Sequence, residues 1–116
     1  IEYVNQHKLP SVSKLLACEN FTEASKILNE LSFTDLAQLN EAIFRWLEKN
    51  HKDSADTTIA GNLISYFNWL DSNGKKELQA HFASIVSAER YPNALNFIVE
   101  KAGALYKKLL DLSSDL

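Results

Sequence analysis

Apolar residues recur from Tyr91 to Leu116 at alternating steps of four and three residues. The positions that keep this spacing are Tyr91, Leu95, Ile98, Ala102, Leu105, Leu109, Leu112 and Leu116. Because these steps return to the same side of an α-helix, they predict one helix over 91–116 with a continuous apolar seam. Val99, Tyr106 and Leu110 are expected to widen that seam. A helix this apolar needs cover from the rest of the chain, so we expect it at the centre of the fold.

Upstream of this segment, apolar residues at helical spacing alternate with polar turn signals. Further helices are predicted over residues 11–18, 21–31, 32–49, 57–70 and 75–89. Asn20 stands three residues before Glu23, which is the spacing of a helix-capping pair. Ser32 or Thr34 is expected to cap the next helix, and Ile27 is expected on the apolar side of the helix over 21–31.

Turn-forming residues mark the limits of the predicted helices. The stretch 50–56 is the most polar and predicts a longer loop. The stretch from Asp71 to Gly74 predicts a firm helix end, because Asn and Gly tolerate the left-handed conformation that closes a helix. Pro92 suits the first turn of the final helix. Residues 1–8 predict either a helical turn or a frayed lead-in.

These segments predict an all-α fold of five or six helices, packed as one compact bundle over residues 1–116. A chain of 116 residues is long enough to form one domain around a single core. It holds three Gly and two Pro, fewer turn residues than a sheet protein of this length needs. Gly61 and Gly103 lie inside predicted helices, where Gly lowers stability, so we expect close helix–helix approaches there.

Two of the predicted helix ends share a sequence pattern. The segments from Phe44 to Asn50 and from Phe67 to Asn73 both read Phe-x-Trp-Leu-acid-x-Asn. The pattern predicts a last turn that buries bulky aromatic side chains and an end that is closed by Asn. Two copies favour partly repeat-like helix pairs inside an irregular bundle, with a stack of HEAT-like repeats as the alternative.

Composition and charge narrow the class of protein. Hydrophobic residues make up 46% of the chain and charged residues 23%, as in folded globular domains. The formal net charge of −3 provides no general attraction to nucleic acid or to an anionic membrane. No apolar run is long enough for a membrane span. Because the sequence contains no Met, we expect it to be a piece of a longer protein or a processed one.

Candidate catalytic and metal-binding residues show no recognised spacing. Cys18 is the single cysteine, which favours a reducing, intracellular compartment, and we expect it to serve as a buried small apolar residue. His7, His51 and His81 share no metal-ligand spacing. We therefore expect no metal, no other cofactor and no catalytic activity. The alternative is a small enzyme that uses His51, His81 or Cys18.

Aromatic residues exceed what one apolar stripe per helix accommodates. Phe44 and Trp46 lie two residues apart, as do Phe67 and Trp69, so the members of each pair occupy different helix faces. Burial of all these rings inside the bundle is one interpretation. The other is an exposed aromatic patch that binds a protein partner, because such side chains dominate interface energies. The candidates for this patch are Trp46, Trp69, Phe97 and Tyr106.

Lysines form the alternative candidate site, which would contact the phosphates of a nucleic acid. Its candidate residues are Lys75, Lys76, Lys101 and Lys108. Glu100 and Asp111 interrupt this run of positive charge, and aromatic residues do not alternate with the lysines as base-stacking platforms would. A solvated outer face is the favoured interpretation, so a protein partner is preferred to a nucleic acid.

The segment from Leu78 to Leu112 resembles the helical C-terminal domains of the WD-repeat proteins in the small-subunit processome, the particle that matures ribosomal RNA. The matching stretches are Ile85-Val86-Ser87-Ala88-Glu89, in a leucine-rich helix with an acidic residue, and Ala102-Gly103-Ala104-Leu105, in a closing helix. The region from Phe21 to Trp46 would be the preceding helix pair, whereas 50–74 does not follow the family closely. The resemblance implies a non-catalytic scaffolding module of a large ribonucleoprotein in ribosome biogenesis, and hence a nucleolar location.

Overall fold

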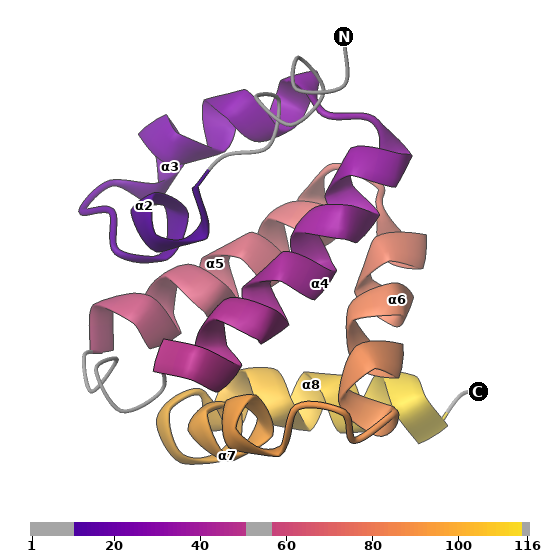
Figure 1. The fold of residues 1–116 in the computed structure, drawn as a ribbon. Coiled ribbons are helices and arrows are strands. Elements are labelled where there is room, and N and C mark those ends of the chain that lie inside the picture. The colour runs from indigo at the N-terminus through magenta and orange to yellow at the C-terminus, as the bar shows by residue number, and fades with distance from the viewer. Residues whose placement is uncertain (1–10, 51–56, 115–116) are drawn as a thin grey trace, which may run out of the picture.

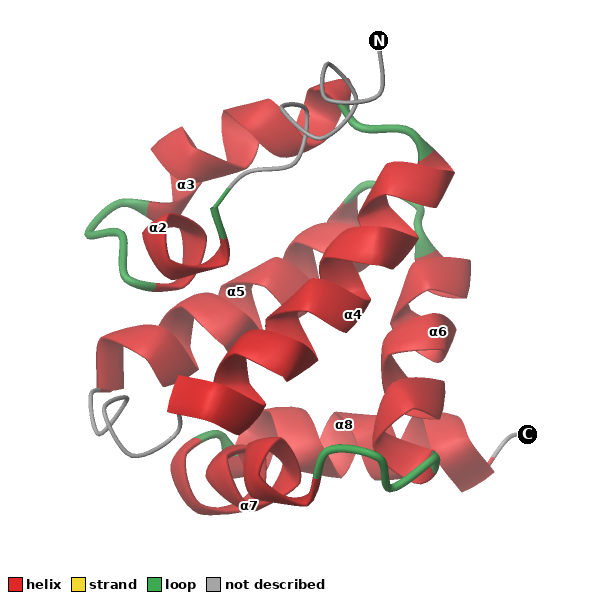
Figure 2. Ribbon diagram, viewed as in Figure 1, coloured by secondary structure: helices red, strands yellow, loops and turns green. Residues whose placement is uncertain are grey.

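The computed structural model of the protein describes residues 11–50 and 57–114. Within these ranges the chain forms seven α-helices and one 3₁₀ helix and no strand, so the predicted all-α fold is confirmed (Figures 1 and 2). The elements are α2 (Val12–Leu16), α3 (Phe21–Ala24), η1 (Ser25–Glu30), α4 (Phe33–Asn50), α5 (Thr57–Ser72), α6 (Lys76–Ser87), α7 (Pro92–Lys101) and α8 (Gly103–Ser114). The predictions for 1–8, for the loop after Asn50 and for Leu116 lie outside the described residues.

Helices α4, α5 and α6 form the middle of the molecule, and shorter elements cover two sides of it. Helix α4 packs against α2, α6 and α7, whereas α6 packs against α4, α5 and α8. In Figure 1 the α2–α3 segment lies at the upper left, alongside α4 and α5, and the α7–α8 pair lies across the bottom of the molecule. The core therefore sits between the long central helices, and the last two helices cover it from below in this view.

The expectation of one central helix over 91–116 is wrong. The helix breaks at Ala102, whose φ of −135° and ψ of 51° are not helical, and α7 and α8 contact each other across this break. We call these two helices together the α7–α8 hairpin. This hairpin lies at the end of the bundle and not at its centre (Figure 1). The apolar seam nevertheless faces inward on both sides of the break, because Ile98, Ala102, Leu105 and Leu109 are all buried.

The expected widening of that seam is also wrong at two positions. Val99 is 43% exposed and Leu110 is 49% exposed, whereas Tyr106 is half-buried against the core. A straight helix at the centre of the bundle would have been covered on several sides. A helix that lies across one end is covered on one side only, so its flanking apolar residues reach solvent.

The rings of Phe44, Tyr66 and Phe67 meet around Phe82 in the middle of the core. The ring of Phe82 lies 4.7 Å from that of Phe44, 5.6 Å from that of Phe67 and 6.2 Å from that of Tyr66, measured between centroids. Tilted and edge-on pairs of this kind add about 0.5–1.5 kcal/mol each beyond the burial of their area. Phe82 on α6 therefore joins α4 and α5, which contribute the other rings.

Buried amide side chains hold the helices together through backbone carbonyls. The Asn62 side chain donates to the carbonyls of Leu16 at 2.6 Å and of Cys18 at 2.8 Å, and so ties α5 to the end of α2. The Gln79 amide donates to the carbonyl of Phe67 at 3.1 Å and ties α6 to α5.

Cys18 is only half-buried, and its thiol donates to the carbonyl of Leu15 at 3.1 Å. The prediction that Cys18 is a buried residue is therefore wrong.

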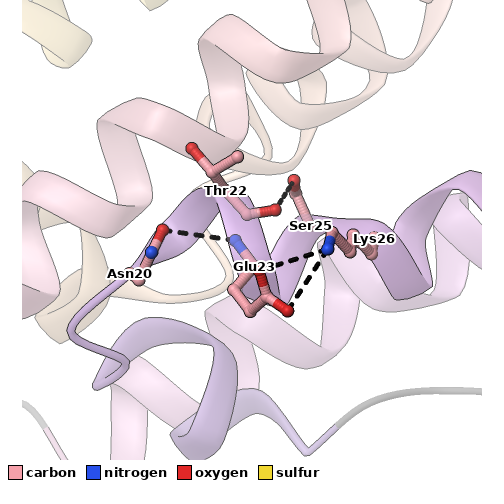
Figure 3. Close-up of polar contacts among 5 residues, drawn as sticks. All are labelled: Asn20, Thr22, Glu23, Ser25 and Lys26. Carbon is pink, nitrogen blue, oxygen red and sulfur yellow. Dashed lines mark hydrogen bonds and ion pairs between the residues drawn. The ribbon is translucent and has the colours of Figure 1, made fainter.

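The capping role predicted for Asn20 is confirmed, but the helix that follows is irregular. The Asn20 side chain accepts a hydrogen bond from the backbone N–H of Glu23 at 3.3 Å (Figure 3). The Glu23 carboxylate turns to Lys26, with an ion pair at 3.2 Å, and the Ser25 hydroxyl donates to the carbonyl of Thr22 at 2.8 Å. After one α-helical turn the chain tightens into η1 at Ser25.

The change to 3₁₀ geometry corrects two expectations for 21–31. The segment is not one regular α-helix, and Ile27 is 38% exposed instead of pointing inward. A 3₁₀ helix has three residues per turn, so positions beyond its first turn rotate away from the face that a 3.6-residue period predicts. Ser32 then caps α4 as expected, because its hydroxyl accepts from the N–H of Asp35 at 3.1 Å and the Asp35 carboxylate accepts from the N–H of Ser32 at 3.3 Å.

The two similar helix ends close in the same way. The side-chain amide of Asn50 donates to the carbonyl of Trp46 at 2.9 Å, and that of Asn73 donates to the carbonyl of Trp69 at 2.8 Å. The predicted closure by Asn is therefore confirmed in both copies. Gly74 follows with a φ of +69°, which Gly adopts without the steric cost that a Cβ brings. This turn leads directly into α6.

Gly61 and Gly103 do not mark close helix contacts, contrary to expectation. A Cβ at either position would meet no other atom within 4 Å, and both residues are exposed. Gly61 lies on the solvent side of α5, and Gly103 starts α8 after the break.

In the described part of the chain, none of the helices combines the length and the apolar character that a bilayer span requires.

Candidate functional site

The α7–α8 hairpin and the end of α6 enclose a shallow apolar groove. Its volume is about 170 Å³, and its lining residues are Val86, Ser87, Glu89, Leu95, Tyr106, Leu109 and Leu110. These residues belong to the last turn of α6 and the turn after it, to α7 and to α8. We name this feature the hairpin groove. Apolar side chains make most of its wall, and Glu89 brings a carboxylate to it.

The break at Ala102 creates the hairpin groove. Ala102 is buried, and its N–H donates to the carbonyl of Ile98 at 2.8 Å, which closes α7. Its own carbonyl accepts from the N–H of Tyr106 at 3.0 Å, which starts α8. One residue therefore ends the first helix and begins the second. Because the chain turns here, side chains that would share one straight helix lie on two helices, α7 and α8. These two helices and the end of α6 form the walls of the groove.

Each helix of the hairpin carries an apolar stripe that runs from the core to solvent. Leu95 and Val99 lie one turn apart on α7, and Tyr106 and Leu110 lie one turn apart on α8. In both pairs the first side chain is half-buried and the second is exposed. A single exposed leucine is common on protein surfaces and does not by itself indicate a binding site. Here an exposed leucine borders an apolar groove, which is the arrangement that favours a binding surface.

The four aromatic candidates do not form one patch. Phe97 is 5% exposed and belongs to the core, so the expectation of an exposed ring at this position is wrong. Trp46 and Trp69 are half-buried against the core, in the last turns of α4 and α5. These two helices run in opposite directions across the molecule (Figure 1), so the tryptophans lie toward different ends. Tyr106 is the candidate that lines the hairpin groove.

A second hollow brings together residues from the start of α4 and the start of α6. Its volume is about 380 Å³, and it is lined by Phe33, Gly74, Lys75, Lys76 and Glu77. Phe33 is 55% exposed. We name this feature the Phe33 hollow. Sequence reasoning missed Phe33, because its spacing of three from the buried Leu36 places it on the apolar stripe of α4.

Lys76 also lies near acidic groups, and the remaining lysine candidates, Lys101 and Lys108, lie on different helices. Lys76 and Lys108 line a third groove of about 350 Å³ together with Asp71 and Asp111, from α5 and α8. The Lys108 amine donates to the side-chain oxygen of Asn68 at 2.9 Å. Two aspartates offset two lysines in this groove, so it offers an anion little net attraction. Lys101 lies at the far end of α7.

The titratable candidates for catalysis serve structural contacts where the structure describes them. The Nδ1 atom of His81 lies 3.1 Å from the Asn40 side-chain nitrogen, which also donates to the carbonyl of Leu78 at 3.1 Å. Burial raises the pKa of the Tyr66 hydroxyl, so this group keeps its proton. His7 and His51 lie outside the described residues. Within the described ranges, no three His, Cys, Asp or Glu side chains gather as a metal site would require.

In the part of the chain that the structure describes, the hairpin groove and the Phe33 hollow are two surfaces on which exposed apolar side chains border a concave site. One is apolar with a single acidic group, and the other is basic with an aromatic ring. Comparison of the chain with protein-family models, with curated proteins and with solved structures finds no match.

Proposed function

We propose that this domain is a non-catalytic scaffolding module that binds a protein partner through the hairpin groove. The observation that carries the proposal is the exposure of Leu110, 49% of which reaches solvent at the edge of an apolar groove. Covering an apolar side chain of this size stabilises a complex by about 25 cal/mol for each Å² removed from water. Half-buried Tyr106 and Leu95 extend the same surface inward.

The form and charge of the groove favour one kind of partner segment. The two stripes of the hairpin present apolar side chains at helical spacing, which suits an amphipathic helix laid into the groove. Glu89 lies at the groove and is exposed. We therefore expect the partner helix to insert apolar anchors toward Tyr106 and Leu110 and to place a lysine or arginine beside Glu89, because opposite charges across an interface fix its register.

Site-specific photo-crosslinking tests this proposal on the full chain. A photoreactive residue at Ser87, an exposed position in the groove, is expected to form a cross-link with a defined partner in extracts of the source cells. Leu110→Asp should abolish that cross-link, because it places a charge where the apolar anchor binds. Ile27→Asp is the matched control: it adds the same charge at an exposed apolar residue of η1 and should leave the cross-link intact.

Two outcomes of the cross-linking experiment would contradict the proposal. One is a cross-link that survives Leu110→Asp unchanged. The other is the absence of any specific cross-link at Ser87 while a photoreactive residue beside Ile27 captures a partner. A charge reversal at Glu89 adds a sharper test. Glu89→Lys should weaken the binding of a partner that places a basic residue beside Glu89, and it should not change the binding of a partner that lacks this residue.

We further propose that the partner belongs to a ribonucleoprotein assembly of ribosome biogenesis. The support is the resemblance of Leu78–Leu112 to the helical C-terminal domains of processome WD-repeat proteins. A fluorescent fusion of the intact parent protein should then concentrate in the nucleolus. An even distribution through the cell would contradict this location and leave the groove proposal to be judged by its own cross-links.

A further inference from the structure

The Phe33 hollow combines an exposed aromatic ring with two lysines that are distant from it in sequence. Phe33 begins α4, whereas Lys75 and Lys76 lie at the start of α6. All three line one hollow of about 380 Å³, a volume within the range of small-ligand sites, about 300–1,000 Å³. The ring is 55% exposed. Large apolar side chains with this exposure beside a hollow often mark a binding surface.

Rigid elements hold the two sides of the Phe33 hollow. The reciprocal hydrogen bonds between Ser32 and Asp35 fix the first turn of α4, from which Phe33 projects. On the other side, the N–H of Lys75 donates to the carbonyl of Leu70 at 2.8 Å, which anchors the turn between α5 and α6. Helices α4 and α6 also pack directly against each other. The backbone positions from which the ring and the two lysines project are therefore fixed before any ligand binds.

We propose that the Phe33 hollow binds single-stranded nucleic acid, with a base stacked on the Phe33 ring and phosphates beside Lys75 and Lys76. Single-strand sites combine an aromatic face for the base with cations for the backbone, and this hollow contains both. An acidic peptide would use the lysines but has no need of the ring. A purely apolar peptide would use the ring but would have to desolvate two ammonium groups at a cost.

The acidic residue in the hollow makes a specific prediction about strength. Glu77 lines the hollow, and Lys76 also lies in the groove that contains Asp71 and Asp111, so acidic groups partly offset the two positive charges. The whole chain also carries a net charge of −3. Binding should therefore be weak, because like charges oppose the approach of phosphate, and it should fall only moderately as salt rises, because two phosphate contacts are made. Glu77→Gln should tighten the binding of a single strand and leave the stacking on Phe33 unchanged.

Fluorescence anisotropy with the full chain and a labelled oligothymidylate of about eight nucleotides measures this binding directly. Two phosphate contacts predict that the logarithm of the association constant falls against the logarithm of salt concentration with a slope of about −1.4. Lys75→Ala or Lys76→Ala should reduce the slope to about −0.7. Lys101→Ala removes the same charge at the end of α7 and should leave the slope unchanged.

The contribution of the ring is tested separately from that of the charges. Phe33→Leu keeps an apolar side chain at an exposed position but removes the stacking face, and should weaken binding about tenfold. The same variant should bind an abasic oligonucleotide of equal length as well as the unaltered chain does. Circular dichroism should show that each variant remains helical, because the side chains of Phe33, Lys76 and Glu77 are exposed and that of Lys75 is only half-buried.

The possible outcomes decide between the occupants. Salt-dependent binding that needs both the ring and the lysines supports the proposal. Equal binding of the thymidylate and the abasic strand, or of polyglutamate, would assign the hollow to anions in general and overturn it. Absence of binding at low salt, or binding that Lys101→Ala weakens as much as Lys76→Ala does, would also overturn it. The hairpin groove lies at the opposite end of α6, on α7 and α8, so its cross-links are not expected to change with any of these results.

Discussion

The hydroxyl of Tyr66 donates a hydrogen bond to the side-chain oxygen of Asn40 inside the core. Both residues are completely buried. The nitrogen of the same Asn40 amide donates to the carbonyl of Leu78 and faces His81. One amide therefore joins α4 to α5 through Tyr66 and to α6 through Leu78. Because a carbonyl only accepts, the Leu78 oxygen also fixes which end of the amide faces Tyr66.

Removal of the Tyr66 hydroxyl tests the energetic weight of this connection. Tyr66→Phe leaves the buried oxygen of Asn40 without its donor, so the free energy of unfolding should fall by about 1–3 kcal/mol. Urea denaturation followed by circular dichroism measures the loss. Tyr106→Phe is the matched control, since it removes the same hydroxyl from a tyrosine that is only half-buried. Equal losses for the two variants would contradict the role assigned to the buried amide.

The same hydroxyl predicts how stability responds to alkaline pH. Burial raises the pKa of Tyr66 above the ordinary tyrosine value of 10.0, so the folded state holds this proton more tightly than the unfolded state does. The stability that this raised pKa provides is fully present below pH 10.0. As the pH rises above that value, the free energy of unfolding should fall by up to about 1.4 kcal/mol per pH unit. Urea denaturation at pH 8 and in steps above pH 10, taken at ~1 unit intervals, should show this fall.

Tyr66→Phe provides the comparison for the alkaline measurement. The variant has no proton to lose at this position, so its stability should fall less steeply above pH 10.0 than that of the unaltered chain. The other tyrosines are common to both proteins and cancel in the comparison. Parallel curves for the two proteins would show that another group controls alkaline unfolding.

Phe82 should be among the most costly residues to truncate. Its ring is completely buried and contacts rings from both α4 and α5. Phe82→Ala should lower the free energy of unfolding by about 3–5 kcal/mol, because it removes apolar burial and leaves a cavity. Phe33→Ala removes the same atoms from an exposed position and should cost far less. Thermal or urea unfolding checks the difference, and similar costs at the two positions would contradict the placement of the core.

The glycines predict substitutions of opposite sign. Gly61 is exposed in the second turn of α5 and has open space where a Cβ would lie, so Gly61→Ala should stabilise the protein by about 0.5–1 kcal/mol. Gly74 also has open space, but its φ is +69°. Gly74→Ala should therefore destabilise by about 1–2 kcal/mol. The midpoint of urea unfolding gives both values, and a gain for Gly74→Ala would contradict the left-handed turn.

Features that depend on neighbouring residues could be predicted from the sequence alone. The cap at Asn20, the cap at Ser32 and the closures by Asn50 and Asn73 each need only a side chain and a backbone group within four residues. The helical class and most helix limits follow from the same local periodicity. The inward seam through Ile98 and Leu105 also follows from it, even though the helix itself is broken.

Only the tertiary structure decided which residues meet across the chain and which remain exposed. A heptad pattern continues unchanged through Ala102, so it carries no signal for the break that makes the hairpin groove. Phe97 is buried and Phe33 is exposed, although periodicity favours the reverse. Burial depends on whether a neighbouring element covers a helix face, and that is set by packing among distant segments. Local spacing therefore determined where the helices form. The packing of these helices against one another determined which of their faces stay exposed, and hence the surfaces proposed for binding.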